Sequence, residues 1–512
     1  MSFEIWVIPF FGQGHIFPCI ELCKHLASRN LKVTLIISST VATSIPSSLH
    51  QHPLLRITQI TSSPSPPPSP SHSPPRHNHL SQELETILAD TTRPICAIID
   101  VMMNWSSPLF KKFQVPTVAF FTSGACSAAL ELAASKAHPL DFKPGETRFL
   151  PGLPENMALT YSDLKQRPHD PPPRGGPPRH GGGAGFPPPP GRGSPKFNDP
   201  PVPPSLGSGP PHHGSGAEFH PPPRRGPPKL GDPPPWVEEV RETIGLMINT
   251  CHDLERPFID YIANHVEKPV WGVGPLLPEQ YWKSSSSLSR DREVRSDRRS
   301  SVTEEEVIEW LDSKPHGSVL YVSFGTEVGP TVEEYDELAQ ALESCEQAFI
   351  WVLQPGSGRP GPPRHGSEAE GGYFPHGLDR KVGDKGLIVI GWAPQLLILS
   401  HPSTGGFLSH CGWNSTMEAI VRGVPLLAWP IRGDQHHDAK LVVSHLKVGY
   451  MVTDDLSKVT KGVIVKGIKE LMGDKELKKR AEILSTKFQH GFPTSSIAAL
   501  DHFKDYIHKI HL

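Results

Sequence analysis

A chain of 512 residues is long enough for two ordinary domains with sizeable cores. Its 50 Lys and Arg against 53 Asp and Glu leave a net charge of −3, which argues against nucleic acid or another polyanion as a partner. The seven cysteines are odd in number and include no C-x-x-C pair, so they indicate buried thiols in a reducing compartment rather than a disulfide framework.

The apolar N-terminus does not have the pattern of a signal peptide. It lacks a basic leader, carries Glu4, and is interrupted by Gly12-Gln13-Gly14 after the length of one strand. No stretch reaches the roughly 18 consecutive apolar residues that a transmembrane helix needs. We therefore expect a soluble, cytoplasmic monomer without integral membrane contact.

Strand-like and helix-like stretches alternate through the first half of the chain. Apolar, β-rich runs predict strands, and a spacing of 3.6 residues predicts a helix after the first of them. The predicted strands are residues 3–10, 32–37, 95–99, 117–121 and 245–249, and the predicted helix is residues 16–28. Strands separated by helix-length connections imply a parallel sheet with helices on both faces.

Residues 168–235 follow neither pattern and hold 25 of the 59 prolines, together with many Gly, His and Arg residues. Pro lacks a backbone donor and fixes φ, while Gly raises the entropy cost of order, so neither helix nor sheet can propagate. The composition predicts a disordered or polyproline insertion in a surface loop. A metal site remains open through its histidines, as does a ligand for an SH3- or WW-like domain. The histidines are His169, His180, His212, His213 and His220.

The alternation resumes in the second half. The predicted strands are residues 318–323, 349–353, 387–390, 406–408 and 426–429, with helices at 332–343 and 438–447. Two such halves predict a two-domain α/β protein with a cleft between the domains. We expect an N-terminal domain at 1–275, a polar linker at 276–302, a C-terminal domain at 303–490, and a helix at 491–512 that packs back on the N-terminal domain.

Residues 392–435 are the most informative stretch, because polar and aromatic residues are concentrated there at strand-to-helix junctions. Open α/β sheets bind ligands at such junctions. The stretch begins with Trp392-Ala393-Pro394-Gln395, continues with His410-Cys411-Gly412-Trp413-Asn414-Ser415-Thr416-Met417-Glu418, and closes with Asp434-Gln435. The backbone N–H groups at the start of the predicted helix, with Asn414 and Ser415, form a natural phosphate site.

Gly12-Gln13-Gly14-His15 follows the first predicted strand and opens a helix. The helix dipole disfavours a cationic imidazole there, which keeps His15 neutral and able to accept a proton, although a single His at a helix start is more often structural. The dinucleotide fingerprint G-x-G-x-x-G fails because Phe17 stands at its third glycine, which argues against NAD. Asp100 ends a predicted strand, where it could equally cap a helix.

The 44 residues of the 392–435 stretch resemble, without an insertion, the signature of plant family 1 UDP-dependent glycosyltransferases. The resemblance covers the chain apart from the Pro-rich segment. It implies the GT-B fold, in which two Rossmann-like α/β domains with parallel sheets face a cleft, here with a Pro/Gly-rich disordered insertion. It further implies inverting transfer of glucose from UDP-glucose to a hydroxyl of a small plant secondary metabolite such as a flavonoid, phenolic or terpenoid.

The same resemblance implies roles for individual residues. His15 falls on the general base in the pattern G-x-G-H-x-x-P, and Asp100 on the carboxylate that holds its other nitrogen. The donor-binding set is Trp392 on the uracil with Ala393 and Gln395 at its edge, Glu418 on the ribose, Thr326, His410, Asn414 and Ser415 on the diphosphate, and Trp413, Asp434 and Gln435 on the sugar, with Thr122 nearby.

The remaining expectations concern cofactors, the sugar and the acceptor. No metal or other cofactor is expected, since no D-x-D-like pair flanks the phosphate site and the UDP-sugar is a co-substrate. Gln435 favours glucose over galactose, and Phe11, Phe17 and Met102 are expected to face the acceptor. Two alternatives remain open: a nucleotide-sugar epimerase or hydrolase on a similar scaffold, and a non-catalytic UDP-sugar-binding protein that interacts through its Pro-rich segment.

Overall fold

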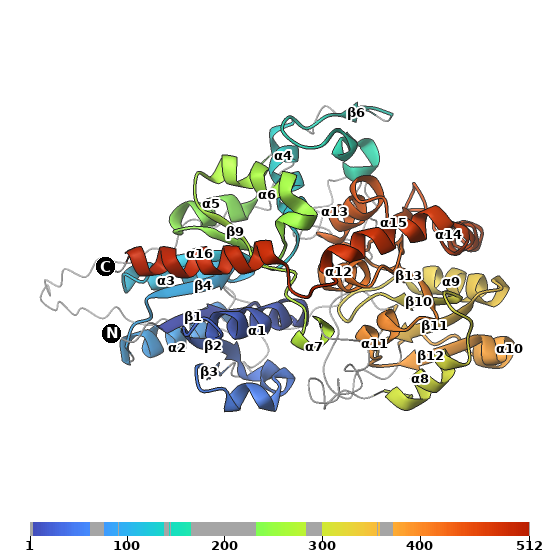
Figure 1. Cartoon of the computed structure of the whole chain (residues 1–512), viewed down its shortest axis with the longest axis horizontal. Helices are drawn as coiled ribbons and strands as arrows, with labels where there is room; N and C mark the ends of the chain where they lie inside the picture. The colour runs from blue at the N-terminus through green and yellow to red at the C-terminus, as the bar shows by residue number, and fades with distance from the viewer. Residues whose placement is uncertain are drawn as a thin grey trace, which may run out of the picture. The chain divides into compact units, whose positions relative to one another are not determined.

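The computed structural model describes residues 4–61, 76–90, 92–137, 143, 145–164, 232–282, 300–355, 357–358 and 372–510. Two parallel sheets organise them (Figure 1). The N-terminal sheet has seven strands in the order β3-β2-β1-β4-β5-β8-β9, and the C-terminal sheet has six in the order β12-β11-β10-β13-β14-β15. Both orders reverse direction once, as doubly wound folds do. The expected pair of Rossmann-like sheets is thus confirmed.

The N-terminal half contains the following elements. Its strands are β1 Glu4–Ile8, β2 Lys32–Ser38, β3 Leu55–Ile60, β4 Cys96–Asp100, β5 Thr117–Phe121, β8 Leu246–Ile248 and β9 Val270–Gly272, with a short antiparallel pair of β6 Thr147–Arg148 and β7 Leu159–Thr160. Its helices are α1 Gln13–Ala27, α2 Arg76–Asp90, α3 Ser107–Lys112, α4 Ala125–Lys136, α5 Pro235–Glu242, α6 His252–Val266 and α7 Glu279–Trp282, with a 3₁₀ turn η3 Val101–Ser106.

The C-terminal half repeats the arrangement. Its strands are β10 Val319–Ser323, β11 Ala348–Leu353, β12 Gly386–Ile390, β13 Thr404–Ser409, β14 Leu426–Ala428 and β15 Gly449–Met451. Its helices are α8 Glu304–Asp312, α9 Val332–Ser344, α10 Leu378–Val382, α11 Gln395–Ser400, α12 Trp413–Val421, α13 Gln435–Lys440, α14 Lys461–Gly473 and α15 Lys475–Ser485, and α16 Thr494–Ile510 follows them.

Each sheet is covered on both faces, so its central strands are apolar throughout rather than alternating with polar residues. In β1, Ile5 and Val7 face one core cluster, and Trp6 and Ile8 face the other. In β10 the same period of two divides the strand between the two cores of the C-terminal half. Uninterrupted apolar runs are therefore what identified these strands in the sequence.

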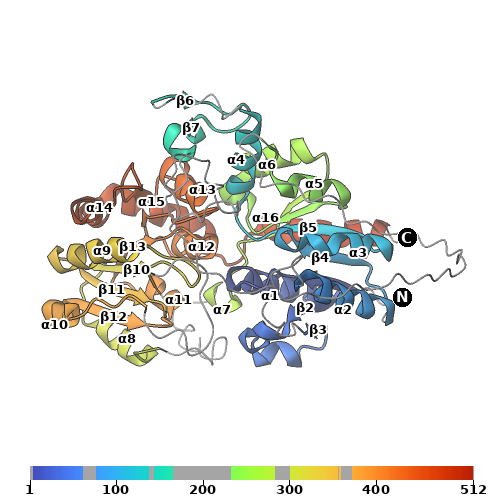
Figure 2. The same ribbon diagram turned by 180° about the vertical axis from the view of Figure 1, so that it is seen from behind.

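Helix α16 returns to the N-terminal half, as Figure 2 shows from the side opposite to Figure 1. Leu500, Phe503 and Ile507 recur at helical spacing and are fully buried in the core that contains β1 and α1. Burial of three such side chains contributes about 1.5–3 kcal/mol each. Arg29 adds an ion pair to Asp501 of α16, at 2.7 Å between Nε and Oδ1.

A fifth core cluster joins the two halves. It combines residues of β5, α4 and α6 with residues of α11 and α12, among them Trp413, Met417 and Ile420. The two Rossmann-like halves therefore share an apolar core.

Several expectations need correction at element boundaries. The helix predicted at 438–447 begins at Gln435 and ends in a π-helical turn, Leu441–His445. Strands β3, β9 and β15 were not predicted. Most of the Pro-rich segment and residues 283–299 of the expected linker lie outside the described residues. Leu276 and Tyr281, at the start of that linker, are buried rather than solvated.

All seven cysteines are buried and free, as the composition indicated. Among the described residues, no helix is long and apolar enough to span a membrane.

Candidate active site

The expected site residues lie at the carboxyl ends of the parallel strands. In the N-terminal sheet, the loop before His15 follows β1 and Asp100 ends β4, and these strands are neighbours at the point where the strand order reverses. In the C-terminal sheet, Thr326 follows β10 and His410 follows β13, again at the reversal. Doubly wound sheets bind ligands at such switch points.

His15 and Asp100 are in direct contact. Nδ1 of His15 lies 2.7 Å from Oδ2 of Asp100 and 2.8 Å from the hydroxyl of Thr122. A carboxylate only accepts, so Nδ1 carries the proton and the lone pair is on Nε2. Asp100 is fully buried, whereas the His15 side chain is 28% exposed. Oδ1 of Asp100 accepts from the Met102 backbone N–H at 2.9 Å, so Asp100 is also the cap of η3.

Several charges act on the pKa of His15. Burial opposes protonation, but Asp100 outweighs it, helped by Asp434 and Glu327, so that the pKa of His15 is raised above its usual value. The last two carboxylates come from the C-terminal half. The protonation of His15 thus responds to both halves of the molecule.

The glycine loop after β1 is in contact with the C-terminal half. Nδ2 of Asn414 donates to the carbonyl of Gly14 at 2.9 Å. A Cβ atom on Gly12 would lie 2.8 Å from Oε1 of Glu327, so only glycine lets Glu327 approach this closely. Asn414, expected on the diphosphate, therefore also connects α12 to the first turn of α1, which carries His15.

Gln395 and Glu418 are held in one hydrogen-bond network. Nε2 of Gln395 donates to Oε2 of Glu418 at 2.6 Å and to the Ser415 hydroxyl at 3.0 Å, while its Oε1 accepts from the hydroxyl of Tyr321. The Gln395 side chain is therefore engaged by protein, which leaves its backbone as the part that can meet a uracil edge. The backbone carbonyl of Glu418 in turn accepts from the Tyr281 hydroxyl at 2.6 Å.

His410 lies at the centre of the expected phosphate site. Burial lowers its pKa to about 4, so the ring is neutral at pH 7. Cβ atoms on Gly325 or Gly412 would lie 2.7 and 2.5 Å from Nε2 of His410, so both glycines make room for the imidazole. Cys411, which stands between His410 and Gly412 in the sequence, has a φ of 60°, which a non-glycine residue adopts only under local constraint. No sequence pattern predicts the positive φ of this residue.

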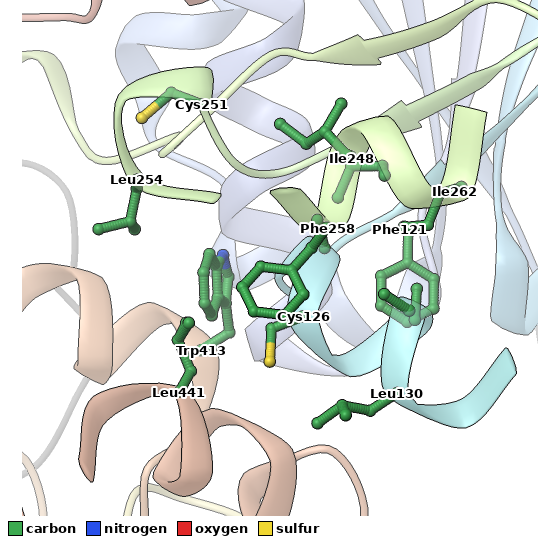
Figure 3. Close-up of a cluster of buried hydrophobic side chains, with 14 of the residues drawn as sticks. Phe121, Cys126, Leu130, Ile248, Cys251, Leu254, Phe258, Ile262, Trp413 and Leu441 are labelled. Atoms are coloured by element: carbon green, nitrogen blue, oxygen red, sulfur yellow. The ribbon is translucent and has the colours of Figure 1, made fainter. Parts of the chain in front are cut away.

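The side chain of Trp413 is buried between the two halves. Its indole is 4% exposed and lies in the core shared by the halves, near Cys126 and Phe258 (Figure 3). Its Nε1 donates to the carbonyl of Asn249 at 2.7 Å. The indole is thus held by the N-terminal half, and any contact of this residue with a sugar falls to its backbone. The burial of this indole depends on a contact between residues 164 positions apart, which no local sequence pattern shows.

The remaining sugar-side residues lie at the start of α13. Oε1 of Gln435 accepts from the backbone N–H groups of Ile431 and Arg432, at 2.9 and 3.1 Å. These bonds fix the carbonyl end of the amide, so its NH₂ end is the one free to turn toward a ligand. Asp434 precedes Gln435 and is close enough to His15 to raise its pKa. Trp392 and Ala393 follow β12, at the same carboxyl edge of the sheet.

The expected acceptor residues differ in their surroundings. Phe17 and Phe11 are partly buried and pack against the two core clusters of the N-terminal sheet. Met102 is 56% exposed in η3, two residues after Asp100. Of the three, Met102 is therefore the one free to meet an acceptor. Within the described ranges, no group of three or more His, Cys, Asp or Glu residues is arranged to hold a metal ion.

Comparison with known proteins agrees with this arrangement. Residues 297–499 match the family described as UDP-glucoronosyl and UDP-glucosyl transferase. UDP-glucosyl transferase 73M2 of Saponaria officinalis is 28% identical, with 93% of this chain and 90% of the relative covered. UDP-glycosyltransferase 73B4 of Arabidopsis thaliana is 26% identical at 93% and 91% coverage, and the scopoletin glucosyltransferase of Nicotiana tabacum is 26% identical at 92% and 90%.

Solved structures show the same fold. The Glycyrrhiza uralensis UGT73P12 complex with glycyrrhetinic acid 3-O-monoglucuronide superposes with a TM-score of 0.71 and 23% identity, covering 100% of this chain and 96% of the other. TcCGT1 in complex with UDP gives 0.68 and 23%, covering 99% and 100%. In the 392–435 signature, in its two sheets and along most of its length, this chain is therefore similar to the plant UDP-dependent glycosyltransferases.

Proposed function

We propose that this enzyme transfers glucose from UDP-glucose to a hydroxyl group of a plant secondary metabolite, such as a flavonoid, phenolic or terpenoid, with inversion at the anomeric carbon. The observation that carries the proposal is the hydrogen bond of 2.7 Å between His15 and Asp100 at the switch point of the N-terminal sheet. The names of the relatives from Saponaria and Nicotiana, both glucosyltransferases, support glucose.

The proposed reaction is one direct displacement. Nε2 of His15 takes the proton of the acceptor hydroxyl, and the oxygen forms a bond to the anomeric carbon as the bond from that carbon to the β-phosphate oxygen breaks. Asp100 stabilises the imidazolium that forms. The proton remains on His15 until solvent removes it, and UDP leaves with the electron pair.

The donor side follows from the arrangement of the C-terminal half. We assign the uracil to the ring of Trp392 with the backbone of Ala393 and Gln395, and the ribose hydroxyls to Glu418. The diphosphate would be met by neutral donors at the start of α12, where the helix dipole favours negative charge. These donors are Thr326, His410, Asn414 and Ser415. Asp434, the amide NH₂ of Gln435 and the backbone of Trp413 would contact the sugar.

Thr122 takes a different role in this proposal from the one that the resemblance implied. Its hydroxyl lies 2.8 Å from Nδ1 of His15. In this proposal Thr122 mainly orients the base together with Asp100, and a contact with the sugar is its secondary role. The donor set contains no acidic pair suited to a metal, so the proposed reaction uses no metal and no further cofactor. We also propose that the enzyme works as a cytosolic monomer, in keeping with its seven free thiols.

An acceptor screen with UDP-glucose, read by product mass, tests the proposal. A mass gain of one hexosyl unit would identify the reaction and the acceptor together, and parallel assays with UDP-galactose and UDP-glucuronate would test the sugar. UDP release without a glycosylated product across a broad panel would favour a hydrolase or epimerase instead. UDP-sugar binding without turnover, with loss of a partner on deletion of residues 168–235, would favour the interaction protein.

His15→Ala tests the base. We expect transfer to fall by about 10²–10⁴-fold, because the variant has no group to take the acceptor proton, while UDP binds as before. The exposed His316 lies far along the chain, and His316→Ala serves as the matched control. Turnover by His15→Ala comparable to the wild type would refute the assignment.

Asp434→Ala or Gln435→Ala should instead raise the KM for the donor or lower kcat.

A further inference from the structure

A fully buried carboxyl group that the proposed reaction does not use lies beside the sugar-binding residues. Asp438 is on α13, one turn after Gln435, and has no solvent exposure. Neither of its carboxyl oxygens has a hydrogen-bond partner in regular geometry among the described residues, and the same holds for the buried hydroxyl of Ser123. Ser123 is close enough to influence the pKa of Asp438. The two buried polar groups are therefore close to each other, and a hydrogen bond from the Ser123 hydroxyl acts to lower the pKa of Asp438.

Their positions connect the two sides of the active site. Ser123 stands directly between Thr122, which bonds to His15, and the start of α4. Asp438 stands on the helix whose first residue is Gln435. The two helices are in contact nearby, where Oγ of Ser127 lies 3.2 Å from Nδ1 of His437. The Asp438–Ser123 contact thus lies between the base and the sugar-binding helix.

The surroundings of Asp438 are acidic. Its titratable neighbours are Asp434 on its own helix, Glu131 and Cys126 on α4, Glu255 on α6 and Cys411 after β13. Nearby basic groups are otherwise engaged: Lys440 is paired with Asp163 at 2.5 Å, and burial lowers the pKa of His437 to about 4. Two further titratable groups, on elements that contact α13, already have partners. Glu418 accepts a hydrogen bond from Gln395, and Nδ1 of His445 lies 3.4 Å from Oδ1 of Asn156.

A charge on Asp438 is therefore opposed by burial and by its acidic neighbours, and only the Ser123 hydroxyl favours it. Burial raises the pKa of Asp438 well above its usual value, and the carboxylates of Asp434 and Glu255 add to the effect. The pKa of Glu255 is itself raised to about 7 by burial. A neutral carboxylic acid, by contrast, has an O–H that can donate to the Ser123 hydroxyl.

We propose that Asp438 is a positioning residue that works as a neutral acid, holding α13 against the start of α4 so that Asp434 and Gln435 face His15. The role rests on the proposed glycosyl transfer. When Asp438 loses its proton at alkaline pH, the new carboxylate stands among acidic neighbours without a cation, and the contact between the two helices weakens. Stability and donor use then decline together.

Asp438→Asn separates the shape of this side chain from its charge. The amide keeps the volume and a donor for Ser123 but cannot ionise. We expect its kcat/KM at neutral pH to stay within about threefold of the wild type, since the exchange conserves volume. The wild type should lose donor affinity and activity as the pH rises through the raised pKa of Asp438, and Asp438→Asn should lose much less. Asp438→Ala should lower kcat/KM by about 10- to 100-fold through misplacement of α13.

The sign of the stability effect follows from the raised pKa. The unfolded chain releases the Asp438 proton near pH 4, and the folded chain keeps it, so this acid destabilises the fold progressively as pH rises toward its folded pKa. The Tm of Asp438→Asn should therefore exceed that of the wild type, by a margin that grows with pH. Asp454→Asn, at an exposed position, should show no such margin.

Melting of the apo protein and titration with UDP need no acceptor, so these measurements test the proposal independently of whether glucosyl transfer is the reaction. Equal pH dependence of Tm in the wild type and Asp438→Asn would overturn it. So would an Asp438→Asn variant that folds but is as impaired as Asp438→Ala, because the charge would then be required. If Asp438→Ala does not fold, the comparison of wild type with Asp438→Asn decides alone.

Discussion

Nδ1 of His15 has two oxygen atoms within hydrogen-bonding distance and only one proton to share between them. Asp100 and the hydroxyl of Thr122 both accept from it, which fixes the tautomer and leaves the lone pair on Nε2. The same ring receives the field of Asp434 and Glu327 from the other half of the chain. The basicity of His15 therefore depends on carboxylates from both halves of the chain.

Asp100→Asn tests this arrangement. A base is active above its pKa, and the pKa of His15 is raised by Asp100, so the acid limb of kcat/KM should lie above pH 6.5 in the wild type. In the variant the limb should move to lower pH, while the rate falls by about 10⁴-fold because the amide can hold the wrong tautomer. A pH–rate profile measures both. An acid limb that does not move would contradict the pairing, and the exposed Asp379→Asn is the control.

For single residues, the sequence predicted the side chains at the strand ends better than those that hold the two halves together. His15, Asp100 and the signature residues follow from motif spacing, and the structure places them at the strand ends. Glu255 and Asp438 were not singled out and the buried position of the Trp413 indole was not expected, because their contacts join residues more than a hundred positions apart. Local patterns carry no record of such contacts.

Several elements of the two halves meet at the start of α4. Oε1 and Oε2 of Glu255 from α6 accept from the backbone N–H groups of Cys126 and Ala125, at 2.7 and 2.9 Å. They satisfy donors that the first turn of a helix leaves open. The ring of Trp413 packs against the same turn at Gly124, where a Cβ atom would lie 2.5 Å from Cη2.

Gly124→Ala should therefore loosen the contact between α4 and α12. The added methyl group would meet the Trp413 ring and, at 2.9 Å, Oε2 of Glu255, and overpacking of this kind costs about 1–3 kcal/mol of unfolding free energy. Denaturant unfolding and the KM for the donor measure the effect. Gly462→Ala, with nothing within 4 Å of its Cβ, is the matched control and should be neutral or stabilising. Equal stabilities of the two variants would contradict the argument.

Helix α16 gives a second prediction for elements. Phe503 is fully buried against Trp271, with ring centroids 5.3 Å apart, so Phe503→Ala should cost about 3–5 kcal/mol. Ile497 on the same helix is 40% exposed, and Ile497→Ala should cost less than about 0.5 kcal/mol. Chemical denaturation compares the two. The site residues contact neither side chain, so the turnover of folded Phe503→Ala should remain near that of the wild type.

The strands that the sequence predicted are those with a continuous apolar run, such as β4 and β10. Strand β3 is at the sheet edge and alternates irregularly between half-buried and exposed residues, so no run marks it. Strands β9 and β15 have three residues each and contain glycine. Their pairing depends on neighbours already in place, which a single sequence does not display.

For the molecule as a whole, the shared core predicts how the protein unfolds. Residues from both halves, including Phe258 and Trp413, belong to one buried cluster, so neither half can expose its share without the other. We expect a single cooperative transition, with calorimetry, tryptophan fluorescence and circular dichroism giving coincident midpoints. UDP should raise that common midpoint, since it binds only the folded state. Two separated transitions, with UDP shifting only one, would show that the halves are independent.

The return of α16 also affects how the chain folds during synthesis. The core around β1 and α1 includes Leu500, Phe503 and Ile507, which are translated after the entire C-terminal half. At about 5–20 residues per second, the two hundred residues from α7 to α16 take roughly 10–40 s to emerge. During that interval the N-terminal sheet presents the apolar surface that α16 later covers. The half that is made first is thus the last to be completed, and chaperones have their longest opportunity to act on it there.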